Sequence, residues 1–193
     1  MNGVQRRSRL VKVAMELVGR TVQAERAWLA WRLEAALTEH QHKNWTDFIR
    51  PMLACRYYHD SMDYQTCWVK FNDNSVIVTR YGLIQITNGA FCPMTPNEKG
   101  ERLKKVAQHL GKLSYAEQIW LAWNLLLNVG QITDFVEYAK NVYTCLRHQR
   151  TWDNSDHVLI FNDSSALVLR AVFNTRTYGY DYHVEEVTTA EEL

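Results

Sequence analysis

The sequence predicts an α+β fold built as a tandem duplication, in which a unit of three helices and a small antiparallel sheet occurs twice. Two observations lead to this prediction. One series of residues recurs in order along the chain, and within each occurrence a helical periodicity gives way to short apolar runs separated by turn residues. The composition, 47% hydrophobic and 22% charged over 193 residues, is that of a folded domain. We expect the two units to pack as an intrachain pseudo-dimer, since symmetric dimers are the commonest oligomers.

The repeat returns at an offset of 87 to 93 residues. The run from Arg9 to Leu17 returns from Arg102 to Leu110, and the segment around Trp28 returns around Trp120. The other anchors are Gly19 and Gly111, Thr46-Asp47-Phe48 and Thr133-Asp134-Phe135, Cys55 and Cys145, Phe71 to Ser75 and Phe161 to Ser165, and Arg80 and Arg170. This order predicts a first unit over residues 4–94, a second over 95–187 and an acidic tail over 188–193.

The first helix of each unit is expected to be amphipathic. In the first unit Leu10, Ala14 and Leu17 share one face, and charged residues lie away from it. Gly19 and Gly111 follow at the position where a glycine commonly ends a helix.

The second helix of each unit is apolar nearly all round, which predicts that its neighbours bury it. Trp28 and Trp31 lie three residues apart on one face, as do Trp120 and Trp123. These rings could form a stacking platform for bases or another ligand. Core packing is the favoured interpretation, because burying two indoles stabilises a fold by several kcal/mol, on the order of 2 to 3 each.

A third helix is expected to begin near Asn44 and near Thr133, with Pro51 breaking the first of the two. Cys55 and Cys145 follow these starts among apolar neighbours, so we expect both to be buried thiols within helices.

Strands are expected to complete each unit. Residues 67–71 and 75–79 flank Asn72-Asp73-Asn74, and Asn and Asp tolerate the left-handed geometry of tight turns. Asp73 and its counterpart Asp163 need no role beyond that turn. The matching hairpin is expected over residues 158–161 and 166–169, and a third strand over 83–87 and 175–184.

Each unit has an arginine at the end of an apolar strand, Arg80 in the first unit and Arg170 in the second. Unpaired guanidinium groups would be costly there, so we expect Arg80 and Arg170 to have structural roles as internal ion pairs. Their predicted partners are the carboxylates that both units also keep, Glu25 and Glu117 or Asp47 and Asp134.

The charge of the chain narrows the possible partners. A formal net charge of +1 excludes a histone-like polycation and a polyanionic mimic of nucleic acid. Basic residues nevertheless recur on the first helices, as Arg9 and Lys12 and again as Arg102 and Lys105. Paired by a pseudo-twofold axis, they would form a composite nucleic-acid-binding surface, but a solvated helix face is the favoured interpretation.

We expect neither a metal nor a cofactor. Histidines cluster once, at His40, His42 and His59 with Asp60 and Asp63, and the second unit keeps none of these residues. The chain has no phosphate-binding glycine loop and no common catalytic motif. Its four cysteines show no closely spaced pair, which favours a reduced, cytoplasmic protein. No apolar run is long enough to span a membrane, so we expect no membrane contact.

One aromatic motif belongs to the second unit alone. Tyr178, Tyr180 and Tyr182 alternate, which would place the three rings on one face of a strand. Tyrosine is favoured at protein interfaces, although packing across the sheet is an equal alternative. We therefore expect a non-catalytic protein-binding module, an inhibitor or adaptor of a larger complex, with a profile shared by small inhibitors of phages and mobile elements. A nucleic-acid-binding regulator and an enzyme with an unfamiliar site are the alternatives.

Overall fold

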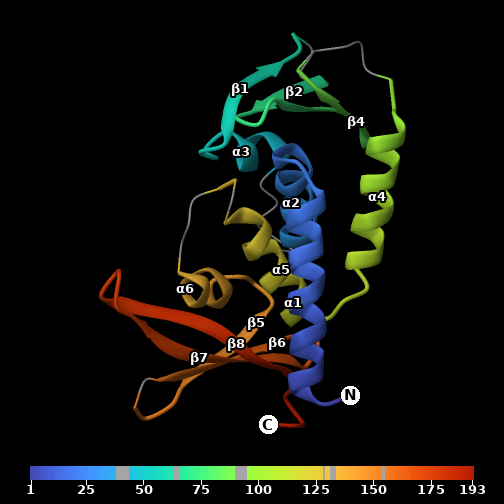
Figure 1. Cartoon of the computed structure of the whole chain (residues 1–193). Helices are drawn as coiled ribbons and strands as arrows, with labels where there is room; N and C mark the ends of the chain where they lie inside the picture. The colour runs from blue at the N-terminus through green and yellow to red at the C-terminus, as the bar shows by residue number, and fades with distance from the viewer. Residues whose placement is uncertain (38–43, 63–65, 90–94, 128, 131–133, 154) are drawn as a thin grey trace.

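The computed structural model describes residues 1–37, 44–62, 66–89, 95–127, 129–130, 134–153 and 155–193. Within these residues the fold is α+β, with six helices and two four-stranded antiparallel sheets (Figure 1). The helices are α1 (Gly3–Arg20), α2 (Gln23–Leu37), α3 (Trp45–Ile49), α4 (Glu98–Leu110), α5 (Tyr115–Leu126) and α6 (Phe135–Lys140). The strands are β1 (Cys55–Asp60), β2 (Thr66–Phe71), β3 (Ser75–Arg80), β4 (Leu83–Asn88), β5 (Cys145–Arg150), β6 (Asp156–Phe161), β7 (Ser165–Asn174) and β8 (Gly179–Thr189).

The order of three helices followed by four strands occurs twice, which is consistent with two units. The strand orders are β1-β2-β3-β4 and β5-β6-β7-β8, so each sheet is a simple antiparallel meander. The predicted hairpins are confirmed, and so is the third strand of the first half; that of the second half runs over 179–189 rather than 175–184. Each sheet also has a fourth strand that the sequence did not predict. No helix in the described part of the chain combines the length and apolar character needed to cross a membrane.

The extra strands begin at the two cysteines. The third helices end at Ile49 and Lys140, and Cys55 and Cys145 open β1 and β5, so the prediction that these thiols lie in helices is wrong. Both strands are edge strands with mostly exposed or half-buried residues, and they lack the alternation of a half-buried strand. Burial raises the pKa of both thiols, in keeping with inert side chains.

The turn of each β-hairpin caps the central helix of its own half. In the first half the Gln23 N–H donates to Asp73 Oδ2 at 2.8 Å, and the Ala24 N–H donates to Ser75 Oγ at 3.0 Å. Val22, which precedes α2, offers no side-chain acceptor, so the hairpin supplies what the helix lacks. Asp73 therefore has a role beyond its own turn.

The second half repeats this capping with the same geometry. Tyr115 N–H donates to Asp163 Oδ2 at 2.8 Å, and Ala116 N–H donates to Ser165 Oγ at 3.0 Å.

Burial alone would raise the pKa of Asp73, but the backbone hydrogen bond from Gln23 and the bonds from Ser75 hold it below its usual value. In the first half the ionised carboxylate of Asp73 is thus the form that ties sheet to helix.

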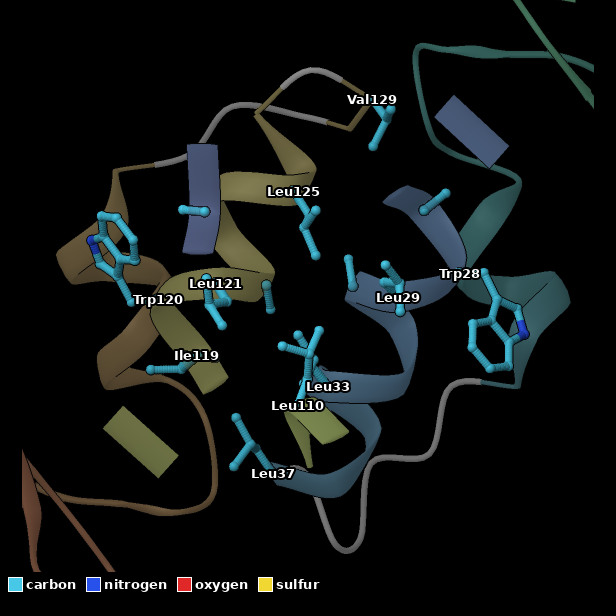
Figure 2. Packing of buried hydrophobic residues seen from close by; sticks show 14 of the residues in the cluster. Trp28, Leu29, Leu33, Leu37, Leu110, Ile119, Trp120, Leu121, Leu125 and Val129 are labelled. Carbon is cyan, nitrogen blue, oxygen red and sulfur yellow. The ribbon is translucent and has the colours of Figure 1, made fainter. Parts of the chain in front are cut away.

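The two central helices pack against each other and form the middle of one continuous core. Figure 2 shows Leu29 and Leu33 of α2 facing Leu121 and Leu125 of α5, and these four side chains are buried. Trp28 and Trp120 project to opposite sides of this interface (Figure 2). The sequence prediction of a buried second helix is confirmed, and its main partner is the matching helix of the other half.

The first helices are arranged so that α1 packs on the last strand of the chain. It contacts β8 and α5, whereas α4 packs on β4 and α2, so α1 lies on the sheet of the other half (Figure 1). Arg7 Nε donates to the Val184 carbonyl at 3.1 Å. On α4, Gly100 lies so close to the Ile84 carbonyl that an added Cβ would meet its oxygen at 2.1 Å. Packing therefore crosses the boundary between residues 94 and 95 that the repeat predicts.

The two ends of the chain meet on this surface. Thr188 and Thr189, assigned to the acidic tail from the sequence, are the last residues of β8. Arg6 forms a two-pronged ion pair with Glu192, at 2.5 and 3.1 Å, and these hydrogen bonds hold the pKa of Glu192 at about 2. The N-terminal helix is thereby fixed to the C-terminal strand.

We predict that the hairpin caps stabilise both halves equally. Replacing Asp73 or Asp163 with Ala removes a cap and leaves helix N–H groups unpaired, so each change should lower the free energy of unfolding by about 1 to 2 kcal/mol. Urea denaturation of each variant measures this loss. Glu191→Ala, which removes an exposed carboxylate, is the control and should leave stability unchanged. Stability as high as that of the control would contradict the capping role.

Candidate functional site

The second sheet carries a projecting hairpin that the first sheet lacks. In the first half β3 and β4 pair from Arg80 and Leu83, around the two-residue turn Tyr81-Gly82. In the second half the pairing continues past the corresponding residue, Arg170, for four more pairs, from Ala171↔Tyr182 to Asn174↔Gly179. This extension, called here the arm, is visible as the β7–β8 end that projects from the body in Figure 1.

The predicted tyrosines lie on the arm, but not all as predicted. Tyr178 is in the turn rather than in a strand and is 85% exposed, while Tyr180 is 63% exposed. Tyr180 pairs with Phe173 across the arm, with ring centroids 5.6 Å apart. Tyr182 is half-buried at the base of the arm. The single aromatic face expected from alternation thus divides into an exposed tip and a packed base.

Two aromatic side chains that the sequence analysis overlooked belong to the same region. Phe173 is 51% exposed, and Trp152, in the turn between β5 and β6, is 96% exposed. That turn lies beside the base of the arm, because the Ala171 N–H donates to the Ser155 carbonyl at 2.7 Å. Trp152 stands alone among polar residues in the sequence, which is the signal that would have identified it.

Tyr182 packs on a pair of stacked histidines in the second sheet. Its ring meets His157 edge-on, with centroids 4.6 Å apart, and His157 Nδ1 lies 2.8 Å from His148 Nε2. Burial first, and then the nearby Arg150 charge, lowers the pKa of His148; burial, His148 and Arg150 lower that of His157. The rings are therefore held neutral at the base of the arm.

The four predicted core tryptophans divide into two buried and two half-buried rings. Trp28 and Trp120 are buried as predicted, whereas Trp31 and Trp123 are half-buried and each lines a groove. Trp31 meets Trp45 with centroids 5.6 Å apart, and Trp123 meets Phe135 at 5.1 Å. Core packing is thus only part of their role.

The two grooves occupy corresponding places in the two halves. The Trp31 groove, of about 780 Å³, is lined among others by Trp28, Trp31, Trp45, Arg32, Arg80 and Lys104. The Trp123 groove, of about 970 Å³, is lined among others by Trp120, Trp123, Phe135, Asn124, Val11 and Tyr180. Each groove takes one wall from the first helix that packs on that sheet, α4 for the first groove and α1 for the second.

The matching third helices correct one detail of the sequence repeat. Asn44 caps α3 and precedes Trp45, and Asp134 caps α6 and precedes Phe135. Asp134 therefore corresponds to Asn44, and the prediction that pairs Asp134 with Asp47 is wrong. The Thr-Asp-Phe match is therefore displaced by three residues, about one helical turn, from the correspondence of the two caps.

The helix carboxylates expected to pair with the two arginines are not their partners, although Arg170 does pair with carboxylates of its own half. Arg170, with its side chain 59% exposed, lies 3.2 Å from Glu185 and 3.8 Å from Asp156, on its own sheet rather than against a helix. Arg80 is exposed and lies over the Tyr81 ring at 5.9 Å. Arg80 ends β3 at the surface, and Arg170 lies within β7 where the sheet passes into the arm. Both guanidinium groups therefore stay in water and need no buried carboxylate.

The expected carboxylate partners have other roles. Glu117 accepts a hydrogen bond from the Ser114 N–H in the capping box of α5. Glu25 is buried at the matching place in α2, where burial raises its pKa against the lowering effect of Arg102 and Lys99. A carboxyl of raised pKa is the kind of group that an enzyme would use. The place of Glu25 in the first turn of α2 is, however, a structural reason for finding a carboxylate there.

The basic residues of the first helices are exposed but do not converge as one set. Arg102 and Lys105 line a groove of about 610 Å³ between α1 and α4, together with Lys99. Arg9 and Lys12 do not line it, and Glu16 does. Arg20 of α1 lines it as well, so of the four predicted residues only the α4 pair, Arg102 and Lys105, lies in this groove.

The predicted histidine cluster is only partly within the described residues. His40, His42 and Asp63 lie outside them, and His59 and Asp60 lie on β1, with His59 packed against Trp68 at 5.3 Å. Among the described residues no three His, Cys, Asp or Glu side chains form a group that could hold a metal ion.

No protein-family model matches the chain, and comparisons with curated proteins and with solved structures found no match.

We predict that the histidine pair makes stability fall below neutral pH. Both pKa values are lower in the folded protein than the ordinary value of 6.5, so the unfolded chain binds more protons as the pH falls past that value. The free energy of unfolding should be highest above pH 6.5 and decrease below it. Urea denaturation from pH 7.5 to 5 measures this slope, which His157→Phe should flatten. The exposed His109→Gln is the control and should keep it.

We predict that Arg170 is a surface residue in energetic terms as well. Replacing it with Met should lower the free energy of unfolding by less than about 1 kcal/mol, because exposed ion pairs are screened by water. Thermal and urea denaturation of Arg170→Met measure this change. A loss of about 3 kcal/mol or more would indicate a buried pair instead.

Proposed function

We propose that the chain is a non-catalytic protein-binding module, an inhibitor or adaptor of a larger complex, whose contact surface is the aromatic tip of the arm. The observation that supports it most is the gathering of large, exposed aromatic side chains at one end of the second sheet: Trp152, Phe173, Tyr178 and Tyr180. Exposed aromatic patches of this kind are typical of interaction sites.

The arm is built to present these rings in fixed positions. Its four additional strand pairs hold the backbone, Asn174 Nδ2 donates to Asp181 Oδ2 at 2.7 Å near the tip, and Tyr182 packs on the histidine pair at the base. A rigid aromatic anchor loses little conformational entropy on binding. The arm therefore suits a partner with a shallow apolar depression.

The backbone of Tyr178 supports a role for its side chain. Its φ of +54° lies in the left-handed region, which is costly for a bulky residue and easily adopted by Asn or Gly. A tyrosine that is 85% exposed gains little from packing in return. Strain of this kind is typical of positions kept for function.

We further propose that the architecture is a duplicated unit packed as a pseudo-dimer, as the recurring residues predict. The repeated element order, the identical hairpin caps and the two matching grooves support this proposal. The arm has no counterpart on β3–β4, so the proposed protein contact is made by one half. The thiols of Cys55, Cys67 and Cys145 are free, which supports a reducing compartment such as the cytoplasm.

We predict that Tyr178→Asn weakens partner binding without destabilising the fold. Asn tolerates the left-handed backbone, so the free energy of unfolding should stay equal or rise by up to about 1 kcal/mol. The thermal unfolding temperature should stay equal or rise accordingly. Retention of a defined partner from a native extract at physiological salt should fall at least about tenfold, as for loss of an aromatic hot spot. Tyr57→Asn, which alters an exposed tyrosine of the first sheet, is the control and should keep the partner.

Two outcomes would contradict the proposal. One is failure of the wild-type protein to retain any defined partner from several native extracts. The other is equal retention by the wild type and by the combined variant Trp152→Ala, Phe173→Ala and Tyr180→Ala.

A nucleic-acid-binding regulator is the second candidate, and the groove between α1 and α4 favours it. Lys99, Arg102 and Lys105 line this groove and could contact phosphates. Glu16 in the same groove and the near-neutral chain weaken it as a duplex-binding surface. A gel-shift assay at low salt distinguishes it, since Arg102→Ala with Lys105→Ala should abolish binding that Arg9→Ala with Lys12→Ala leaves largely intact.

A further inference from the structure

The two matching grooves share an aromatic framework but differ in charge. In both, a tryptophan of the central helix meets an aromatic residue of the third helix: Trp31 with Trp45, and Trp123 with Phe135. Three cations, Arg32, Arg80 and Lys104, line the Trp31 groove, against one carboxylate, Asp60, among the described residues that line it. Asp60 accepts a hydrogen bond from the Tyr58 hydroxyl and is thus already engaged.

The cations of the Trp31 groove are available to a ligand. Within the described part of the chain, neither Arg32 nor Arg80 forms an ion pair with a carboxylate. Both are exposed, and Lys104 has only an exposed partner, Glu101, at 3.4 Å. Guanidinium groups that converge on a groove without a carboxylate favour an anion, and a phosphate suits their planar fork of donors.

The Trp123 groove lacks each of these cations. Asn124 takes the place of Arg32, and Val11 takes the place of Lys104. Arg170, the counterpart of Arg80, pairs with Glu185 and Asp156 and does not line this groove. Asp134 and Asp181 line it against one cation, Arg7. Arg7 Nε already donates to the Val184 carbonyl, so the net charge of this groove still opposes an anion.

The aromatic wall of the Trp31 groove suits a planar ring. The Arg32 guanidinium lies 5.7 Å from the Trp31 ring centroid and 5.9 Å from that of Trp28. Nucleobases stack both on indole rings and on guanidinium planes, so either surface can receive a base beside a held phosphate. The volume of about 780 Å³ lies within the range of small-ligand sites.

Tyr81 adds an exposed ring to this groove at a cost in backbone energy. Its φ is +46°, in a two-residue turn whose first position favours Asn, yet the residue is a tyrosine that is 73% exposed. Arg80 lies over its ring at 5.9 Å. The strained turn thus holds an aromatic and a cation together beside the groove.

We propose that the Trp31 groove binds a nucleotide, with its base stacked against Trp31 and Arg32 and its phosphate held by Arg32, Arg80 and Lys104. The shared chemistry is a nucleobase joined to a phosphate, supplied by a free nucleotide or by a single strand. The Trp123 groove does not bind it, so the stoichiometry is one per chain. This site is separate from the arm and does not depend on the proposed protein contact.

Titration of the full chain with ATP, GTP, CTP and UTP, followed by tryptophan fluorescence and calorimetry at about 50 mM salt, tests this assignment. We expect saturable binding of at least one nucleotide with one site per chain. Arg32→Ala with Arg80→Ala should weaken it at least about tenfold, because two charge-assisted contacts are lost. Arg170→Ala, the matched variant on the second sheet, should bind as the wild type does.

A second pair of variants separates binding from folding. Tyr81→Asn relieves the strain of the left-handed backbone at this position. The variant should therefore unfold at the same or a higher temperature than the wild type and yet bind the nucleotide more weakly. Trp31→Leu should lose binding, whereas Trp123→Leu, an equal loss of an indole in the other groove, should keep it.

Further probes identify the source of the ligand and the outcomes that overturn the proposal. Binding of a short single-stranded RNA at least about a hundredfold tighter than a mononucleotide, with the same dependence on Arg32 and Arg80, supports a single strand as the source. Comparable affinities support a free nucleotide. The proposal is overturned if neither probe binds, if inorganic phosphate binds as tightly as the nucleotides, if two equivalent sites are found, or if Arg170→Ala weakens binding as much as Arg80→Ala.

Discussion

The packing of α2 against α5 is the constraint on which the rest of the structure depends. Each central helix is apolar nearly all round, and a single small sheet cannot cover it. The helices therefore bury one face against each other and turn Trp28 and Trp120 outward to their own third helices (Figure 2). The hairpin caps then fix each sheet to the start of its helix, and α1 closes the second half by packing on β8.

This arrangement leaves corresponding surfaces in the two halves that have acquired different chemistry. The Trp31 groove keeps cations at the places where the Trp123 groove has Asn124 and Val11. The strand pair that ends in a tight turn at Tyr81 in one half is drawn out into an aromatic arm in the other. The duplication proposed above would account for both pairs of features, since a second copy can diverge at its surface while the first preserves the framework.

The sequence predicted the elements that bury a face and missed those that do not. Apolar periodicity identified the central helices and the hairpins. It could not identify β1 and β5, because these edge strands have largely polar residues. It also could not show that α1 packs on the other half, because periodicity defines an apolar face but not the partner of that face. The arginines were assigned to buried pairs because strand ends were taken as internal. Trp152 was overlooked because its signal, one large ring among polar residues, is not periodic. The grooves were not predicted because they are formed by residues distant in the sequence.

Hydrogen exchange on the intact chain tests the central claim, that both halves share one core and unfold together. Leu121→Ala opens a cavity in α5 at the interface with α2 and is expected to cost about 2 to 5 kcal/mol. The account predicts that the slowest amides of β3, in the first sheet, and of β7, in the second, lose protection by the same amount. Loss of protection confined to the second sheet, with β3 unchanged, would contradict it.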